Sequence, residues 1–533
     1  MKLVRSRSFL QESGATYAGG WTMPAPEASL KHAEDLRDKV AGRYDEAISY
    51  AMPGRPGIRT GPDQSQIYDD TAVVAVPEFA SRTQQGIMPN FSQWASYVPG
   101  ILIDDGDKKD ELARALQGVD RYRFELLNAS NFSVEVYECL LDLSLGTMAL
   151  RIDESASGNP INARAVPLGS VSFGVGPDGR PDPIYEEREL TLNAFQVHYP
   201  DARVPRDVFD GDDPECKYKF VEAWHRDWSK PAEYSYRRTV FVRDKNNRAL
   251  LTEWHHGRGS CPVLIGRWNK AAAEAWGRGP LFNVLPSLRK VNYAERALLD
   301  HSDIAIAGIW TLEDDGIINP STVRLEPGTL LPVAMGSAGL KNVAPGANFD
   351  ITQFLLEEAR TNIKKALFTE QLGNPNKTPM SATEVNQRMA ELARAVGSPF
   401  GRLIMEFVLP AIERVDFILQ KRGLLKLPQV DGKKIKLIAT SPLAQAQRFE
   451  VVDAMDRFVG TLQARLGPEM VNVVIDGSLM ADELADQLQV PKRIMRPAPQ
   501  QKQILQALTQ AATGAQSPSP GGDAGGGQAG PTA

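Results

Sequence analysis

Residues 261–303 read CPVLIGRWNKAAAEAWGRGPLFNVLPSLRKVNYAERALLDHSD, and the periodicity of the chain changes within this stretch. The apolar run 263–268 is short, as in a buried strand, and a loop of small residues follows it. From Gly277 onward, apolar residues recur at spacings of three and four, which is the period of a helix packed on one side. This helical stripe comprises Leu281, Val284, Leu285, Leu288, Val291, Ala294, Leu298 and Leu299. The stretch therefore predicts a strand followed by a long helix in one chain.

Upstream of this stretch, residues 147–262 alternate between short apolar runs and turn clusters. Clusters such as Asp210-Gly-Asp-Asp-Pro214 separate the runs, so we expect an antiparallel sheet layer built from hairpins. The runs are 148–152, 166–173, 183–192, 218–225 and 234–242. Before residue 147 the spacing is helical, and it predicts helices at 28–48, 70–88 and 110–132.

Downstream, residues 309–349 have strand-and-turn character, and a second helix begins near Asp350. The loop Gly373–Pro379 ends that helix, and the capping-box pattern Ser381-Ala-Thr-Glu384 opens a third helix that reaches about Lys421. Glycines and prolines such as Pro399 and Pro410 lie inside the third helix, and because each proline removes a hydrogen bond, a kinked helix is expected. The apolar face of the second helix is predicted to contain Ile351, Phe354, Leu355, Ile363, Ala366 and Leu367.

The end of the chain gives weaker signals. Residues 424–438 are expected to form a hairpin around Asp431-Gly432, and short helices are expected between residues 444 and 513. The segment 514–533 contains seven glycines and three prolines, and this composition cannot bury a core. We therefore expect a disordered tail.

The composition is that of an ordinary globular protein. The 533 residues are 42% hydrophobic and 24% charged, and the formal net charge is -6. A protein that binds nucleic acid over its whole surface is usually basic, so this balance argues against one. Three cysteines are too few and too widely spaced for a disulfide framework or a zinc signature. There is no apolar secretory segment and no apolar run near the ~20 residues of a membrane span, so we expect a soluble protein made in the cytoplasm.

Motifs that would indicate catalysis are missing or stand in the wrong context. Gly174-Val-Gly-Pro-Asp-Gly179 matches the dinucleotide pattern G-x-G-x-x-G, but Pro177 and Pro181 interrupt it, so we interpret it as a hairpin turn. The sequence contains no P-loop, no H-E-x-x-H and no G-x-S-x-G. No catalytic residue, cofactor or metal is therefore predicted.

Three further groups allow both a functional and a structural interpretation. Glu253-Trp-His-His256 with Cys261 could hold a metal, but adjacent histidines point to opposite faces of a strand, which favours a polar strand end. The acidic residues 104–111 lack calcium-loop spacing and are interpreted as a solvated turn. Three aromatic residues could stack on bases, although core packing is the preferred interpretation: Phe91, Trp94 and Tyr97.

Basic residues recur on the two helices that flank residues 309–349. The second helix carries Arg360, Lys364 and Lys365, and Lys377 lies in the loop after it. The first helix carries Arg289, Lys290 and Arg296. A run of charge on a single helix is usually a solvated face. Basic residues on two neighbouring helices of an acidic chain favour local contact with phosphates, which is non-specific and sensitive to salt.

Several segments, in this order and spacing, match a known family. They are residues 68–89 closing on Trp94, Leu145-Gly-Thr-Met-Ala-Leu150, Cys261–Trp268 with Trp276-Gly-Arg-Gly-Pro-Leu281 and the helix to Asp303, and Ser381-Ala-Thr-Glu-Val385 with Leu409-Pro-Ala-Ile-Glu-Arg-Val415. Over roughly residues 28–510 the chain resembles the portal proteins, or head-to-tail connectors, of short-tailed phages (podoviruses).

The resemblance implies an α+β portal fold: a ring-forming subunit with a mainly helical wing, stem and crown, an antiparallel sheet layer in the wing and a small α/β clip. The implied divisions are a flexible arm (1–27), the wing (28–278), two stem helices (279–308 and 350–371), the clip (309–349), the tunnel loop (372–380), a long kinked helix with its return hairpin (381–439), the crown (440–513) and a disordered tail (514–533).

The resemblance also implies the function and the partners. A dodecameric ring at one capsid vertex of the virion, assembled in the host cytoplasm, would let double-stranded DNA pass non-specifically during packaging and ejection. Its partners would be further copies of the chain, the terminase large subunit, a tail adaptor protein, and the major capsid and scaffolding proteins, with no membrane, cofactor or enzymatic activity. The residues expected to face DNA are Lys377, Lys364, Lys365, Arg360, Lys290, Asn374 and Asn376.

Two other interpretations remain open at the level of the sequence. Another structural virion protein, such as a capsid or tail-tube component, would share the composition. A multi-domain hydrolase would need a pair of carboxylates, for which Asp104 with Asp107 or Glu186 with Glu187 are candidates. The order of helix, clip, helix, loop and long helix favours the portal interpretation, because an enzyme needs no long kinked helix and a tail tube would be mostly strand.

Overall fold

The computed structural model describes residues 26–61, 67–100, 106–156, 158–205, 215–243, 249–272, 274–307, 310–311, 341–342, 349–369, 397–426, 435–467, 474–487 and 504. The chain divides into two compact units. Unit 1 takes in residues 1–95, 122–426 and 439–447, and unit 2 takes in residues 96–121, 427–438 and 448–533. Among the described helices, none combines the length and the apolar character needed to cross a bilayer.

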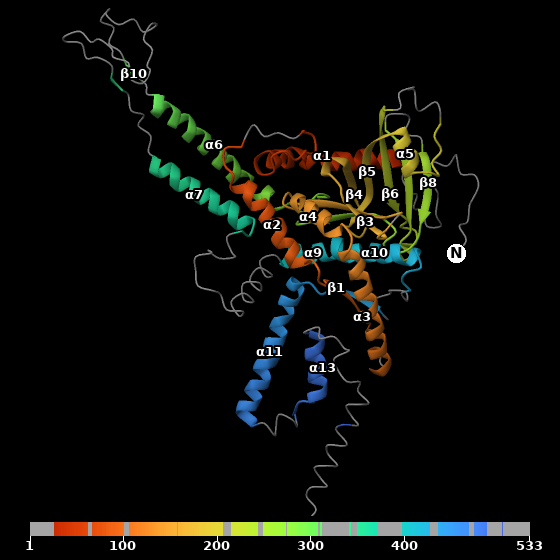
Figure 1. Cartoon of the computed structure of the whole chain (residues 1–533). Coiled ribbons are helices and arrows are strands. Elements are labelled where there is room, and N and C mark those ends of the chain that lie inside the picture. Colours follow the sequence, from red (N-terminus) through yellow and green to blue (C-terminus); the bar gives the residue numbers. More distant parts are fainter. Residues whose placement is uncertain are drawn as a thin grey trace, which may run out of the picture. The chain divides into compact units, whose positions relative to one another are not determined.

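The two main sheets of unit 1 are antiparallel (Figure 1). The larger sheet has the order β4-β5-β6-β7-β8, so its strands are neighbours both in space and in sequence, as the run-and-turn pattern predicts. Its strands are β4 (Val171–Val175), β5 (Pro181–Thr191), β6 (Lys217–Arg226), β7 (Tyr236–Val242) and β8 (Ala249–His255). The smaller sheet has the order β3-β2-β9, with strands β2 (Thr147–Glu154), β3 (Ile161–Ala165) and β9 (Val263–Arg267).

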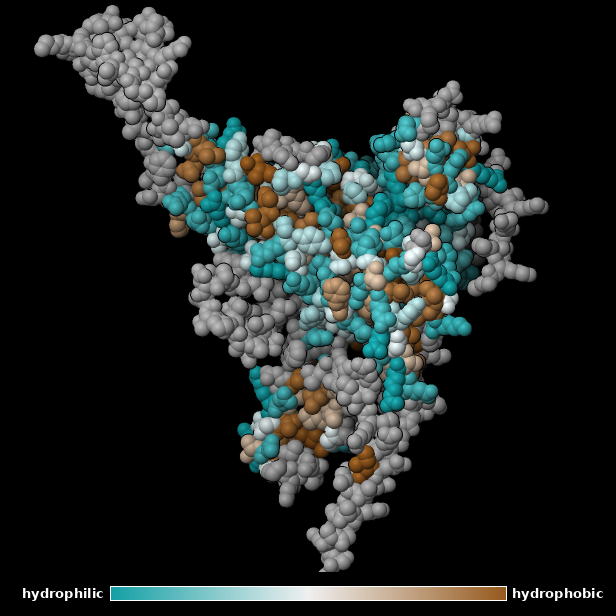
Figure 2. Space-filling view, viewed as in Figure 1, coloured by the Kyte–Doolittle hydropathy of each residue, from teal (hydrophilic) through white to brown (hydrophobic). Residues whose placement is uncertain are grey.

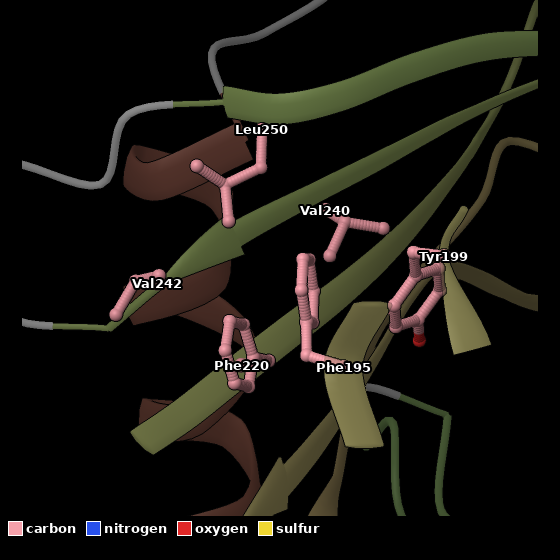
Figure 3. Packing of buried hydrophobic residues seen from close by; sticks show 6 residues of the cluster. All are labelled: Phe195, Tyr199, Phe220, Val240, Val242 and Leu250. Carbon is pink, nitrogen blue, oxygen red and sulfur yellow. The ribbon is translucent and has the colours of Figure 1, made fainter. Parts of the chain in front are cut away.

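Both faces of the larger sheet are covered by helices. On one face α1 (Pro26–Ala51) packs Leu30 and Ala33 against Val221 and Phe241. On the other face α5 (Leu192–His198) stacks Phe195 on Phe220 with ring centroids 4.0 Å apart (Figure 3). Phe220 and Val221 are consecutive, so their side chains point to opposite faces, and one strand serves both cores.

Most of the expected sheet is confirmed, but α5, β3 and β8 were not predicted. The sequence suggested only continuing strand up to residue 192, whereas the chain turns there into a short helix. The side chain of Thr191 caps this helix, because its Oγ1 accepts a hydrogen bond from the amide of Ala194 at 3.3 Å. Residues 253–255, expected to be a polar strand end, lie in β8.

The predicted helix α2 (Thr71–Ile87) packs against α4 (Phe132–Leu143), a helix that was not among those expected from the sequence. Gln84 Nε2 of α2 donates a 2.8 Å hydrogen bond to the carbonyl of Ser133 in α4. The apolar face of α4, including Val136 and Leu140, is buried, and this helix contacts β2 and β3.

Two long helices, α6 (Pro280–Ala307) and α7 (Phe349–Ala366), run antiparallel and form a helical hairpin (Figure 1). Between them, β10 (Trp310–Thr311) pairs with β11 (Lys341–Asn342). The remaining expectations for residues 309–348, and all those for the loop 372–380, concern residues outside the described part of the chain.

The described part of the third predicted helix begins at residue 397. It consists of α9 (Gly397–Leu403), a π-helical turn (Ile404–Val408) and α10 (Leu409–Lys421). The π turn lies immediately before Pro410, where the missing amide hydrogen interrupts the regular hydrogen-bond ladder. The predicted irregularity at this proline is thus a change of helix type.

Unit 2 is built around a two-stranded sheet of β1 (Ala95–Pro99) and β12 (Ile435–Ala439), with α3 (Gly106–Asn128) beside it. Tyr97, Leu116 and Ile435 form its small core. The turn Asp431-Gly432 of the expected hairpin lies outside the described residues, and the strand that follows it, β12, pairs with β1. The helices α11 (Pro442–Leu466) and α13 (Gly477–Gln487) follow.

Candidate functional site

Arg360 joins the α6–α7 hairpin to the body of unit 1. Its guanidinium lies 2.8 Å from the carboxylate of Asp69 and also pairs with Glu295 of α6. The side chain of Asp69 is only 3% exposed, and a carboxylate buried to that extent needs a charged partner. Arg360 was expected to face DNA, and in the subunit it contacts Asp69 and Glu295 of its own chain.

The pairing of Arg360 with Glu295 also sets the height at which the two helices lie beside each other. Lys290 lies five residues from Glu295 toward the start of α6, and Lys364 and Lys365 lie four and five residues beyond Arg360. Both helices rise by the same amount per residue, so the three lysines share one height of the hairpin. All three are exposed, and we call them the basic belt. The other expected DNA-facing residues, Lys377, Asn374 and Asn376, lie outside the described residues.

The hairpin also carries exposed apolar side chains that the sequence analysis assigned to its packed faces. Phe354 and Leu355 were predicted to lie with Ile363, but they are 71% and 55% exposed, whereas Ile363 is buried. On α6, Leu299 is 51% exposed although it continues the predicted stripe. Periodicity indicates the side on which apolar residues lie, and it does not show what covers them. Figure 2 shows apolar surface on this hairpin.

Three glycines allow two chain segments to cross at the base of α6. The amide of Gly279 donates to the carbonyl of Leu145 at 2.8 Å, and the amide of Trp268 donates to the carbonyl of Gly146 at 2.9 Å. A Cβ atom at residue 277 would lie 1.8 Å from the carbonyl oxygen of Gly146, so no side chain fits there. These are the glycines of Leu145-Gly-Thr and Trp276-Gly-Arg-Gly, two segments on which the family resemblance rests, and the crossing explains why both need glycine.

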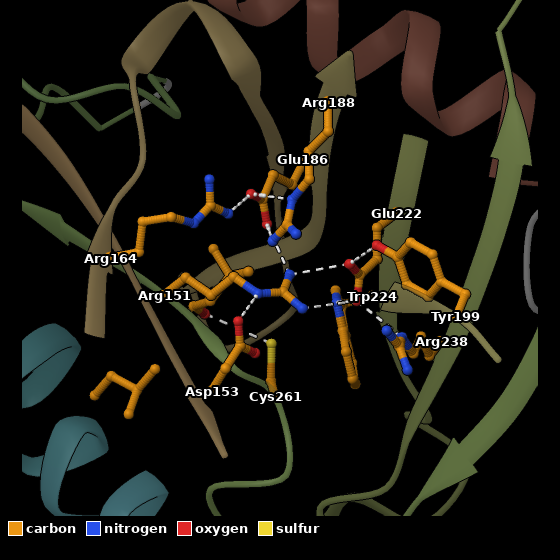
Figure 4. Close-up of polar contacts among 12 residues, drawn as sticks. Arg151, Asp153, Arg164, Glu186, Arg188, Tyr199, Glu222, Trp224, Arg238 and Cys261 are labelled. Carbon is orange, nitrogen blue, oxygen red and sulfur yellow. Dashed lines mark hydrogen bonds and ion pairs between the residues drawn. The ribbon is translucent and has the colours of Figure 1, made fainter. Parts of the chain in front are cut away.

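A network of ion pairs joins the two sheets of unit 1 (Figure 4). Arg151 of β2 donates to Glu186 of β5 at 2.7 Å and to Glu222 of β6 at 3.0 Å. The side chains of Arg151, Glu186 and Glu222 are 5%, 1% and 2% exposed, so these charges lie in the interior. Further partners surround them: Asp153, Arg164, Arg188, Tyr199, Trp224 and Arg238.

The guanidinium groups keep the buried carboxylates ionised. Burial by itself raises the pKa of Glu222, but the charges of Arg151, Arg238 and Arg188 hold the pKa of this carboxyl well below its usual value. The pKa of Glu186 is likewise lowered, because Arg151, Arg188 and Arg164 outweigh its burial. Glu186, one of the carboxylates considered for a hydrolase, is thus fully engaged by arginines.

A cavity of about 90 Å³ lies between β5, β9 and α10 and is lined by charged and aromatic side chains. Asp182 faces it and accepts hydrogen bonds from Trp228 Nε1 at 2.5 Å and from the amide of Arg226 at 3.1 Å. Burial raises the pKa of Asp182 to about 6, although these hydrogen bonds act in the opposite direction. Glu413 also lines the cavity, and its pKa is likewise raised by burial.

The other motifs resolve into structural elements. Gly174–Gly179 lies at the β4–β5 hairpin, where the amide of Gly176 donates to the carbonyl of Arg180, so the hairpin interpretation is confirmed. Trp94 and Tyr97 are buried as predicted, whereas Phe91 is 84% exposed. His256 lies beside Ser235, and Cys261 is buried.

The carboxylates considered for a hydrolase are not brought together in a described cleft. Glu187 pairs with Arg243. Asp104 and the side chain of Asp107 lie outside the described residues. The described residues contain no cluster of three or more His, Cys, Asp or Glu side chains suited to a metal ion.

Comparison with known proteins identifies the class of protein. Residues 26–495 match the family of bacteriophage head to tail connecting proteins, and the chain belongs to this family. It is 25% identical over 490 residues to a probable portal protein of Bordetella phage BPP-1, and the alignment covers 87% of each chain. It is 18% identical over 440 residues to the portal protein of Enterobacteria phage T3, covering 81% of this chain and 79% of the relative.

Solved structures with similarity include the virion of a native gene transfer agent particle, with 13% identity, a TM-score of 0.33, and coverage of 83% of this chain and 95% of that one. Another is the neck of an empty gene transfer agent particle, with 14% identity, a TM-score of 0.31, and coverage of 75% and 86%. Scores at this level do not establish a shared fold. The family match and the two portal relatives confirm the resemblance to phage portal proteins, a structural and non-enzymatic class.

Proposed function

We propose that the chain assembles into a closed ring, expected to be a dodecamer, whose channel conducts double-stranded DNA into and out of a phage capsid. The observation that carries this proposal is the basic belt on the α6–α7 hairpin of a head-to-tail connecting protein. Repeated around a ring, Lys290, Lys364 and Lys365 make a narrow band of positive charge. The exposed lysines thus supply the local charge that sequence-independent contact with phosphates requires.

The overall charge suits a channel that must let DNA slide. A chain with a net charge of -6 gives the ring an acidic surface, which repels the duplex along most of its path. A few lysines per subunit then guide the DNA without trapping it, because each phosphate contact is weak and exchanges with salt ions. Lys377, Asn374 and Asn376 are proposed to extend this contact from the tunnel loop.

The lysines can be tested separately from assembly. In rings carrying Lys364→Glu and Lys365→Glu, we expect weaker DNA retention, and the slope of log affinity against log salt should fall by about one per lost phosphate contact. Lys39→Glu on an exposed part of α1 is the matched control and should leave both quantities unchanged. Intact rings that bind DNA with the same affinity and the same salt slope would remove these lysines from the DNA path.

The remaining partners follow from the same proposal. The ring would occupy the portal vertex of the virion, with the clip (309–349) as the docking site of the terminase large subunit and later of a tail adaptor. The crown (440–513) and the wing (28–278) would lie toward the interior of the capsid. There they would contact the major capsid protein and the scaffolding protein. Deletion of residues 314–346 should leave a ring that no longer binds the motor, and an unchanged packaging rate would refute the clip assignment.

A further inference from the structure

The outer face of α7 combines two apolar side chains with an acidic one. Phe354, Leu355 and Glu358 lie at spacings of three and four, so they share one face of the helix. Phe354 is 71% exposed and Leu355 is 55% exposed. The face that α7 turns toward the body of unit 1 is different, because it holds the buried Ala359 and Ile363. We call Phe354, Leu355 and Glu358 the α7 patch.

The outer face of α6 carries the complementary combination. Tyr293, Arg296 and Leu299 follow one another at three-residue steps and form a continuous stripe. Tyr293 is 77% exposed and Leu299 is 51% exposed. The guanidinium of Arg296 lies 3.9 Å from Asp300, both of these side chains are more than 60% exposed, and it also lies 5.8 Å from the ring centroid of Tyr68. We call Tyr293, Arg296 and Leu299 the α6 patch.

The two patches lie at one height of the hairpin, one on each helix. The pairing of Glu295 with Arg360 places Arg296 within about 3 Å of the height of Glu358, at 1.5 Å of rise per residue. Both patches are exposed in the described part of the subunit, so neither is covered by the partner helix. A heterologous, head-to-tail contact between identical subunits joins two different patches of one chain, and the α6 patch and the α7 patch are two such surfaces.

We propose that these patches form the contact between neighbouring copies of the chain, with the α6 patch of one copy packed on the α7 patch of the next. Arg296 then faces Glu358 of the neighbouring copy, while Tyr293 and Leu299 cover its Phe354 and Leu355. This inference rests on the proposed ring, and it adds the surface and the charge pair that set the register of the ring.

Charge and apolar content select a second copy as the occupant of each patch. DNA would be repelled by Glu358 and would leave Phe354 and Leu355 in water. A second copy supplies a guanidinium for the carboxylate and apolar side chains for the apolar ones, at the same height, because all subunits of a ring stand in the same orientation. A charge pair at such a contact fixes register and excludes wrong partners.

Charge reversal tests the pairing. Native mass spectrometry and negative-stain microscopy would first establish the ring formed by the wild-type protein, which tests the proposed function alone. Arg296→Glu and Glu358→Arg should each raise the concentration for half-assembly at least about tenfold, because like charges then face each other in every contact of the ring. The double variant Arg296→Glu/Glu358→Arg should restore assembly to near the wild-type concentration.

A matched control shows whether the position of the substitution matters, or only the change of charge. Glu357→Arg makes the same charge change one residue away, on the side of α7 where Glu357 approaches Arg360 at 3.4 Å, and it should assemble like the wild type. Thermal unfolding of each subunit would show that the variants fold. Wild-type rings with normal assembly of both single variants would overturn the inference and leave the proposed function standing. Loss of subunit stability in the single variants, without rescue in the double variant, would also overturn it, because the patches would then be covered by the same chain.

Discussion

Arg151 lies where β2 of the smaller sheet meets β5 and β6 of the larger one, and its guanidinium contacts Asp153, Glu186 and Glu222. Replacement by methionine keeps much of the volume but leaves two buried carboxylates without their main partner. We expect Arg151→Met to lower the free energy of unfolding by about 3–5 kcal/mol, as measured by urea unfolding.

The same variant has a characteristic pH dependence. The pKa values of Glu222 and Glu186 are lowered in the folded protein, so the stability they contribute is complete above their unfolded pKa and is lost only as the pH falls through the folded values. In Arg151→Met these carboxyls take up protons more readily, and the stability difference from the wild type should narrow toward about pH 5. The role given to Arg151 would be contradicted if Arg151→Met lowered the unfolding free energy by less than about 1 kcal/mol at pH 7. It would also be contradicted if the stability difference between variant and wild type did not change with pH.

Asp182 has the opposite sign of pH dependence. Burial raises its pKa to about 6 from the ordinary value of 3.8 for an aspartate, so the folded protein binds a proton that the unfolded chain releases between these values. This raised pKa should make the wild type about 1 kcal/mol more stable at pH 5 than at pH 7, relative to Asp182→Asn, which cannot titrate. Unfolding curves at the two pH values give the comparison, and parallel pH profiles for the two proteins would show that Asp182 does not titrate in this range.

At the scale of elements, the crossing of the segment before β2 with the segment before α6 fixes the base of the hairpin. Gly277→Ala would place a Cβ 1.8 Å from the carbonyl of Gly146, and we expect a loss of about 3 kcal/mol in unfolding free energy. Gly42→Ala is the matched control, because it lies in α1 with no atom within 4 Å of the added Cβ, and it should stabilise the protein by about 0.5–1 kcal/mol. Equal effects of the two substitutions would rule out the tight crossing.

The sequence predicts elements better than it predicts their contacts. The stripe from Leu281 to Leu299 and the alternating runs predict α6 and most of the larger sheet, because burial on one side imposes a period on the residues themselves. The ion pair of Arg360 with Asp69 joins residues far apart in the chain, and no local pattern encodes it. For the same reason Phe354 and Leu355 were grouped with Ile363, although only Ile363 is covered within the described part of the subunit.

At the scale of the whole molecule, family membership gives the exposed features of the hairpin a shared explanation. A monomer gains nothing from exposing Phe354 and Tyr293, and exposed apolar patches usually mark surfaces of interaction. In the proposed ring, the two patches would meet between neighbouring copies and the basic belt would repeat around the channel. The account thus predicts that assembly and DNA contact depend on different residues of one hairpin, with assembly variants at Arg296 and Glu358 and DNA variants at Lys364 and Lys365.

The most direct test of the central claim is the oligomeric state and shape of the purified protein, determined by native mass spectrometry together with negative-stain electron microscopy. The account predicts a closed ring, expected to contain a dozen chains, with a central hole wide enough for a DNA duplex. Particles without a central hole would contradict it. So would a protein that stays monomeric or dimeric at every concentration, even when it is produced together with its capsid and scaffolding proteins.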